Sequence, residues 1–251
     1  MTRRPLFAAN WKMYKTPAAA RAYARDFISP AKALTEAADV ALLAPFVSIE
    51  ALAEGLRGTG VAFGAQDCYW EPQGAFTGEV SAAMLSEMGC KYCIVGHSER
   101  RKLFGETDAD VAKKIDALLG SQVTPIVCVG ETFEEHQAGL TLQRVMQQIS
   151  DGLGHLDDDQ RASIVIAYEP IWCIGTGLAD DPESSDRTIG LIRQTLGGLD
   201  DARVLYGGSM KVENAAAFCA CPNIDGGLVG SASLDPSNFI ALVSSGAQVR
   251  G

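Results

Sequence analysis

Several features that would tie the chain to a membrane or to nucleic acid are missing from the sequence. Its 251 residues contain no apolar run of about 18 residues, so we expect no membrane-spanning helix. Lysine and arginine number 21 against 31 aspartates and glutamates, a formal net charge of −10. This excess of negative charge argues against nucleic acid and anionic membranes as partners. An anionic substrate would have to be attracted by local groups, because the overall field repels it.

Residues and motifs that hold metals or dinucleotides are also scarce. The three histidines, His97, His136 and His155, form no cluster along the chain. The cysteines number seven, and the C-x-x-C of Cys90 and Cys93 has no second pair at zinc-site spacing. No G-x-G-x-x-G follows a predicted strand. We therefore expect reduced thiols, no metal site and no dinucleotide-binding fold.

The start of the chain lacks the apolar core of a secretion signal. A basic beginning is followed only by Leu6 to Ala9 before Asn10, which is too short for such a core. Together with the expected reduced thiols, this predicts a cytoplasmic protein.

What the sequence does contain is a regular alternation of apolar strand-like runs and helix-like segments. Thr16 and Pro17, for example, form an N-cap and first helical position. The predicted strands are 6–9, 40–44, 61–65, 92–95, 125–129, 164–167, 204–206 and 227–229. The predicted helices are 17–28, 48–56, 81–89, 108–120, 140–149, 182–196, 212–218 and 236–243.

Eight strands, each followed by a helix, predict an α/β protein with a parallel sheet. Eight such units in about 250 residues have the size of one closed (β/α)8 barrel, so we expect residues 1–251 to form a single domain. An open doubly wound sheet is the alternative. In a barrel the active site is built at the C-terminal ends of the strands.

A carboxylate stands at such a position. The buried run 164–167 leads into Glu169, and Pro170 holds Glu169 away from helical geometry. The apolar residues 171–174 and then Gly175-Thr176-Gly177 follow, which suits a loop that closes as a lid and excludes water.

Other reactive residues follow other predicted strands. Asn10 and Lys12 come after the first strand, where a lysine can place positive charge beside an anion. His97 comes after the fourth, where an imidazole can polarise a carbonyl and move protons between oxygens. A helical turn starting at Ser98 would favour the neutral ring. Arg100 and Arg101 are predicted to form structural ion pairs.

Small residues end the last two strands, and one loop is unusually long. Gly207-Gly208-Ser209 and Gly230-Ser231 allow backbone amides to approach a phosphate, as in barrel phosphate sites. The loop 66–80 carries Tyr69, Trp70 and Phe76, so it needs an apolar place to dock.

Four segments, in order and over nearly the whole chain, resemble the triosephosphate isomerase family. They are Asn10-Trp11-Lys12, Gly74 to Glu79, Val95-Gly96-His97-Ser98-Glu99-Arg100-Arg101, and the Glu169 lid stretch. The resemblance implies interconversion of dihydroxyacetone phosphate and glyceraldehyde 3-phosphate on a TIM barrel, with neither metal nor organic cofactor.

The resemblance also implies roles for individual residues. Glu169 would remove a proton α to the carbonyl, His97 would donate to the enediolate oxygens, and Lys12 would stabilise their charge. Asn10 and Glu99 would lie in the same active site. The phosphate would be held by Gly175, Ser209, Gly230 and Ser231. A homodimer is implied, in which Thr77 reaches toward the partner's active site.

The sequence departs from the family pattern at a few positions. Leu178-Ala179-Asp180 replaces the usual Lys-Thr-Ala at the second lid hinge, and Cys173 replaces an alanine at the lid's start. Asp67 replaces an asparagine, and Ser231 replaces a glycine of the phosphate loop. Two alternatives therefore stay open: a related isomerase of a tetrulose phosphate, and a barrel that binds sugar phosphate without turning it over.

Overall fold

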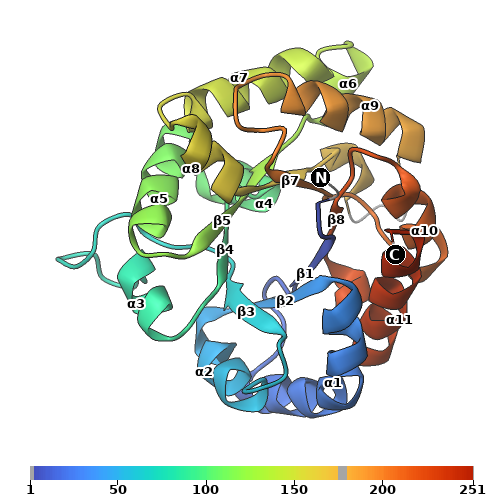
Figure 1. Cartoon of the computed structure of the whole chain (residues 1–251). Helices are drawn as coiled ribbons and strands as arrows, with labels where there is room; N and C mark the ends of the chain where they lie inside the picture. The colour runs from blue at the N-terminus through green and yellow to red at the C-terminus, as the bar shows by residue number, and fades with distance from the viewer. Residues whose placement is uncertain (1–2, 175–179, 251) are drawn as a thin grey trace.

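The chain forms a closed barrel of eight parallel strands, in the order β1 to β8, with β8 paired to β1 (Figure 1). The computed structural model describes residues 3–174 and 180–250. The strands are β1 (Leu6–Asn10), β2 (Asp39–Ala44), β3 (Ala62–Ala65), β4 (Tyr92–Val95), β5 (Thr124–Val129), β6 (Val165–Tyr168), β7 (Arg203–Tyr206) and β8 (Gly226–Val229). The predicted fold class, a (β/α)8 barrel, is confirmed.

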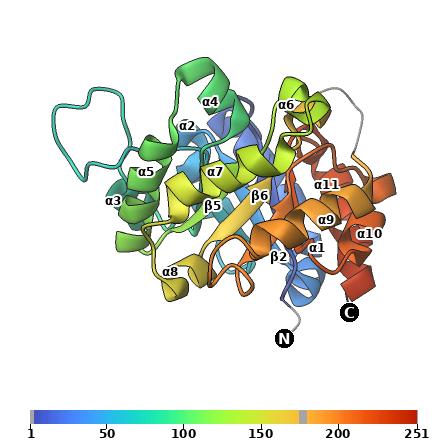
Figure 2. The same ribbon diagram turned by 90° about the horizontal axis from the view of Figure 1, so that it is seen from above.

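Helices surround the barrel, and both chain termini lie at the end opposite α4 and α6 (Figure 2). The α-helices are α1 (Pro17–Ala37), α2 (Phe46–Gly55), α3 (Ala82–Glu87), α4 (Ser98–Phe104), α5 (Asp108–Gly120), α6 (Phe133–Gln137), α7 (Thr141–Leu153), α8 (Asp158–Ser163), α9 (Pro182–Arg193), α10 (Val212–Ala220) and α11 (Pro236–Ala247). Short 3-10 turns are η1 (Ile171–Cys173), η2 (Ser231–Ser233) and η3 (Gln248–Arg250). None of the described helices is long and apolar enough to cross a membrane.

Two apolar layers hold this arrangement together. Side chains alternate along each strand, so Leu6 and Ala8 belong to the cluster inside the barrel, whereas Phe7 and Ala9 pack outward with the helices. Burying one Leu or Phe side chain contributes roughly 1.5–3 kcal/mol. Because side chains fill the interior, the place left for a site is the rim where the strands end.

Some element predictions were wrong. The helix expected to end at residue 28 runs on to Ala37 through Pro30, because Phe27, Ala31 and Leu34 continue its buried face. Tertiary burial there outweighs the cost of a proline inside a helix.

Two short helices were not predicted. Both α6 and α8 begin with a capping box, formed by Thr132 with Glu135 and by Asp157 with Gln160. Those spacings were visible in the sequence and are a known start signal.

Candidate active site

The predicted site residues meet in one cavity at the C-terminal rim of the barrel. The cavity measures about 630 Å³. The predicted residues that line it are Asn10, Lys12, His97, Glu99, Glu169, Ser209, Gly230 and Ser231. Gly175 lies outside the described residues. Thr77 lies on the exposed loop after β3 and not in the cavity lining.

Glu169 is placed one residue beyond β6 and is 2% exposed. Its Oε1 lies 3.1 Å from His97 Nε2, and its Oε2 accepts a 3.0 Å hydrogen bond from the Ser98 amide. Carboxylate and imidazole, the two groups suited to moving protons at neutral pH, therefore face one another inside the cavity.

The hydrogen bonds of His97 identify its tautomer. Nδ1 lies 3.2 Å from the Glu99 amide, and a backbone N–H can only donate. Nδ1 therefore carries a lone pair, and the ring proton is on Nε2, facing Glu169. His97 is also the N-cap of α4, so its backbone position is fixed by the first turn of that helix. A neutral ring with an available N–H is the form that can donate to a substrate oxygen.

Glycines make room for Glu169. A Cβ on Gly207 would lie 2.8 Å from Glu169 Cγ, and one on Gly130 would lie 1.8 Å from the Glu169 carbonyl oxygen. Gly96, with φ of +70°, turns the chain between β4 and His97. A side chain at Gly207 or Gly130 would collide with Glu169, so these glycines help to set the position of the carboxylate.

Lys12 is held in an unusual backbone conformation at the cavity wall. Its φ is +53°, a left-handed value that costs free energy in a residue other than glycine. The Lys12 amide donates to Asn10 Oδ1 at 3.0 Å, and Nζ lies 2.5 Å from Glu99 Oε1. Asn10 and Glu99 thereby fix the ammonium at the mouth of the cavity.

The loops after β7 and β8 supply small residues to the cavity wall. Gly207, Gly208, Ser209, Gly230 and Ser231 all line the cavity. Ser231 opens η2, and its φ is not positive, so a Cβ is tolerated there. A Cβ on Gly230 would lie 3.5 Å from Lys12 Cε, which shows how near the lysine lies to this wall.

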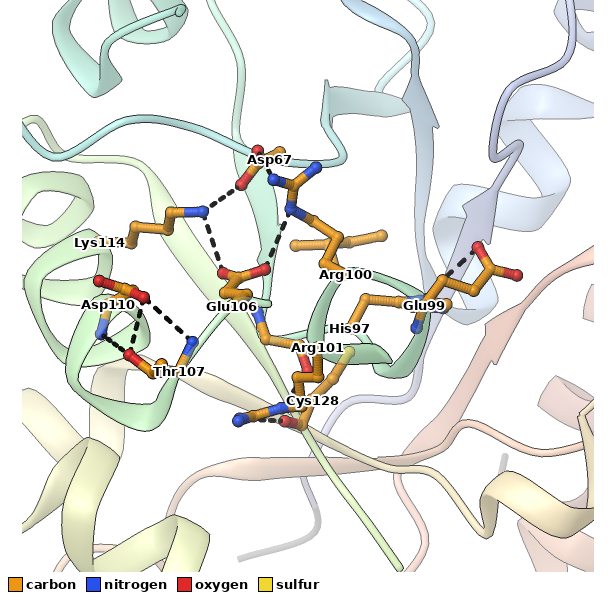
Figure 3. A network of polar contacts seen from close by, with 12 residues as sticks. Asp67, His97, Glu99, Arg100, Arg101, Glu106, Thr107, Asp110, Lys114 and Cys128 are labelled. Atoms are coloured by element: carbon orange, nitrogen blue, oxygen red, sulfur yellow. Dashed lines mark hydrogen bonds and ion pairs between the residues drawn. The ribbon is translucent and has the colours of Figure 1, made fainter. Parts of the chain in front are cut away.

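A network of four charges supports the His97 side of the cavity (Figure 3). Lys114 Nζ lies 2.7 Å from Asp67 Oδ1 and 3.0 Å from Glu106 Oε1. Arg100 spans the same two carboxylates, at 2.9 and 3.0 Å. Glu106 also accepts the Gly96 amide at 3.2 Å, which connects the network to the turn before His97.

Burial and charge act against each other in this network. Burial raises the pKa of Asp67, and the two cations offset only part of that effect. Burial alone would lower the pKa of Lys114. The negative charges of Asp67 and Glu106 outweigh the effect of burial, so the pKa of Lys114 is raised. The prediction that Arg100 and Arg101 form ion pairs is confirmed, since Arg101 Nη1 also lies 2.5 Å from Asp108.

The sequence reasoning missed Glu106 and Lys114. Lys114 lies on the buried face of α5 with Val111, Ile115 and Leu118. A lysine in an apolar stripe is a signal for a buried ion pair, because an unpaired ammonium there would be strongly destabilising.

A second missed carboxylate, Glu131, supports the Glu169 side. It is fully buried, and its Oε1 accepts from Tyr168 Oη at 3.2 Å and from Trp172 Nε1 at 3.0 Å. Burial raises its pKa. Trp172 also packs on His136, with ring centroids 4.4 Å apart. Glu131 therefore anchors the residues on both sides of Glu169.

Within 3–174 and 180–250, no three His, Cys, Asp or Glu side chains are grouped to bind a metal.

Comparison with known proteins agrees with this geometry. A model of the family described as "Triosephosphate isomerase" matches residues 5–246. The chain is 47% identical over 254 residues to the triosephosphate isomerase of Symbiobacterium thermophilum, covering 99% of each chain. It is 46% identical over 249 residues to that of Moorella thermoacetica, covering 96% of this chain and 98% of the relative. It is 45% identical to that of Carboxydothermus hydrogenoformans, covering 96% and 98%. The chain belongs to the triosephosphate isomerase family.

Proposed function

We infer that the chain interconverts dihydroxyacetone phosphate and D-glyceraldehyde 3-phosphate through an enediolate. The observation that carries this is the pair of Glu169 and His97, 3.1 Å apart inside a cavity that Lys12 also lines. A protein that only bound sugar phosphate would have no use for a buried carboxylate facing a proton donor.

Glu169 is the proposed base. It removes a proton from the carbon next to the substrate carbonyl, and the electron pair moves onto the carbonyl oxygen. To do so, its carboxylate exchanges the bonds to His97 and Ser98 for the substrate C–H. His97 Nε2–H is then free to donate to the developing oxyanion. His97 then takes the hydroxyl proton from the adjacent oxygen, which restores the neutral ring and leaves the negative charge on that oxygen. Glu169 returns its proton to the neighbouring carbon as this oxygen becomes the new carbonyl, which completes the isomerisation.

Lys12 is proposed to stabilise negative charge on the substrate, and Asn10 and Glu99 to position it. The wall of small residues from the loops after β7 and β8 is proposed to bind the phosphate, because amides next to glycine and serine can approach an anion closely. Ser209, Gly230 and Ser231 belong to this wall, and Gly175 joins it in the proposal. Exclusion of water by the loop after Glu169 would keep the enediolate from losing phosphate.

We also propose a homodimer. Large apolar side chains stand exposed on segments that follow β1 to β4, which are consecutive neighbours in the barrel. Among them are Met13, 94% exposed, Val47, Phe76 and Phe104. An apolar area of this kind on one side of the rim suits a second copy of the chain. Thr77, at the tip of the loop, would reach toward the partner's active site.

Sedimentation at micromolar concentration tests the dimer. Shortening the loop around Phe76 and Thr77 should yield monomers of low activity. Phe133→Ser, at an exposed phenylalanine of α6 on another part of the rim, is the control and should stay dimeric. A fully active monomer of the unaltered chain would contradict this proposal.

The proposal places the reaction in glycolysis and gluconeogenesis, in the cytoplasm, with the whole chain acting as one barrel domain. A coupled isomerase assay on the purified protein tests the activity. Turnover of triose phosphates is the expected result. Binding without turnover would favour the non-catalytic barrel, and a higher kcat/KM for a tetrulose phosphate would favour the related isomerase.

A further inference from the structure

The η2 turn, by which we mean residues 230–234, is held in place by its backbone carbonyl groups. Two of them accept from the turn itself. The Ser233 hydroxyl donates to the Gly230 carbonyl at 2.7 Å, and the Leu234 amide donates to the Ser231 carbonyl at 3.1 Å. The other three accept from side chains outside the turn, which are Asn238 for the Ala232 carbonyl at 2.6 Å, Tyr23 for Ser233 at 2.8 Å and Lys15 for Leu234 at 2.6 Å. Every carbonyl of the turn therefore has a donor.

Two amide groups of the same turn are left for a ligand. Ser231 and Ala232 both line the cavity. Within residues 3–174 and 180–250, neither of their N–H groups donates a hydrogen bond. Successive backbone N–H groups of this kind suit an anion. The carbonyl contacts thus set the direction in which these two amides point.

Lys15 reaches the turn from a strained backbone position in the loop after β1. Its φ is +70°, a left-handed value that costs free energy in a residue other than glycine. The hydroxyl of Ser48, which is 0% exposed, donates to the Lys15 carbonyl at 2.8 Å and holds this conformation. Most lysines extend into water, whereas this ammonium is bound to the Leu234 carbonyl. The strain therefore has an observable result, which is the placement of a cation at the η2 turn.

Tyr23 acts on the neighbouring carbonyl. It is 2% exposed, and its ring lies 4.8 Å from that of Trp11 and 5.7 Å from that of Phe27, centroid to centroid. Burial raises the pKa of the Tyr23 hydroxyl, so it stays protonated and can donate. Lys15 Nζ lies 5.2 Å from the centre of the Tyr23 ring, as in a cation–π contact. Lys15 and Tyr23 therefore form a pair that holds two consecutive carbonyls.

We propose that Lys15, together with Tyr23, is a positioning residue for the substrate phosphate. The two side chains fix the carbonyls of residues 233 and 234, so that the amides of Ser231 and Ala232 stay directed at the phosphate. Lys15 acts through the turn and does not itself touch the substrate. This inference rests on the proposed phosphate wall. Lys12 lies in the same loop, so one loop would supply charge to the cavity and position the phosphate turn.

The first test measures the Kd of inorganic phosphate for the whole protein by titration calorimetry. Lys15→Met keeps the length of the side chain but removes the donor, and should raise Kd about fivefold, the factor that corresponds to one net hydrogen bond. Lys15→Arg keeps a donor and should stay within about twofold of the unaltered chain. Lys32→Met is the matched control, because it removes the same charge from a lysine of α1 that is 89% exposed. It should leave Kd unchanged, and an equal rise in this control would overturn the proposal.

Salt separates positioning from attraction by charge. At about 1 M potassium chloride the Debye length is about 3 Å, so attraction across longer distances is screened. The ratio of Kd between Lys15→Met and the unaltered protein should persist under this condition. If the ratio fell to one, Lys15 would act by its charge alone and the proposal would be overturned.

Tyr23→Phe provides a second variant, which removes one hydroxyl and keeps the ring. It should also raise the Kd of phosphate about fivefold. Unchanged Kd in Lys15→Met and Tyr23→Phe would overturn the proposal, and Tyr23→Phe alone decides if Lys15→Met does not fold. Because phosphate binding is measured without turnover, a chain that lacks isomerase activity but shows these shifts would refute the proposed function and leave this inference standing. An active isomerase whose variants bind phosphate normally would do the reverse.

Discussion

His97 and Glu169 face one another across 3.1 Å, but different kinds of contact support the two sides of the cavity. On the His97 side, Arg100 and Lys114 each bridge Asp67 and Glu106. On the Glu169 side, the support consists of close contacts with glycines and hydrogen bonds from Tyr168 and Trp172 to one carboxylate, Glu131.

This difference bears on what each side chain can do. Breaking one member of a buried charge network leaves the others uncompensated, so such a network resists rearrangement. Single hydrogen bonds, each worth about 1 kcal/mol net, are exchanged far more easily. The histidine is therefore fixed in place, whereas the carboxylate is free to exchange partners, which the proposed mechanism requires of a base.

Removing the base should have the largest effect. Glu169→Gln keeps the size of the side chain but removes proton abstraction, so we expect kcat to fall by roughly 10²–10⁴-fold. Circular dichroism and the melting temperature should stay near those of the unaltered protein. Near-normal turnover in a folded Glu169→Gln protein would sink the assignment of the base.

The next largest effect should come from breaking the charge network. It should appear in the free energy of unfolding rather than in kcat. Glu106→Gln leaves two cations to share Asp67, and breaking a buried pair costs about 3–5 kcal/mol of unfolding free energy. Urea denaturation measures this loss.

Asp116→Asn is the matched control for Glu106→Gln. It also removes one negative charge, here on α5, but Asp116 and its partner His155 are exposed. It should change the unfolding free energy by less than about 1 kcal/mol. Equal losses in the two variants would mean that the network gives the His97 side no special rigidity.

The common location of Glu169 and His97 could be predicted from sequence because the barrel brings the ends of its strands together. A buried run followed by Glu169 or His97 is enough to place both at one rim. The network could not be predicted in the same way, because Asp67 and Lys114 are separated by 47 positions and nothing local pairs them. The hydrogen bond from the Asp180 amide to the Tyr206 hydroxyl likewise joins residues from distant parts of the chain. The helix expected to end at residue 28 continues through Pro30 to Ala37 because burial, a tertiary effect, decides where α1 ends.

The support on the Glu169 side should show itself in a pH dependence of stability, smaller than the Glu106 effect. Burial raises the pKa of Glu131 above its ordinary 4.5, so the folded state binds this proton more tightly than the unfolded state. The contribution of Glu131 to unfolding free energy is therefore greatest below its ordinary pKa and falls as the pH rises through the raised value.

Glu131→Gln keeps an oxygen to accept from Tyr168 and Trp172 but removes this titration. Relative to the unaltered protein, the variant should gain stability as the pH rises from the ordinary carboxyl pKa of 4.5 through the raised value. Denaturation across that range measures the difference. If the variant instead became less stable than the unaltered protein as the pH rises, the folded state would favour ionised Glu131. The Glu169 side would then also be supported by a buried charge, as the His97 side is.

The smallest effect is expected from a substitution at Ser231, which belongs neither to the charge network nor to the group of residues around Glu131. Its backbone at the start of η2 has no positive φ, so the serine is accommodated without strain. If its hydroxyl adds a hydrogen bond to the substrate phosphate, that bond is worth at most about 1.5–3 kcal/mol, and neighbouring amides compensate part of its loss. Ser231→Gly should then change KM by less than about tenfold and leave kcat nearly unaltered. The serine belongs to the proposed phosphate wall, on the loop after β8, whereas a fourth substrate carbon would have to fit beside His97 and Glu169. The triose phosphates should therefore remain preferred, and kcat/KM for glyceraldehyde 3-phosphate against a tetrulose phosphate decides this. A preference for the tetrulose that Ser231→Gly reversed would show that the phosphate wall selects substrate length, and the substrate assignment would change although the proton-transfer chemistry would stand.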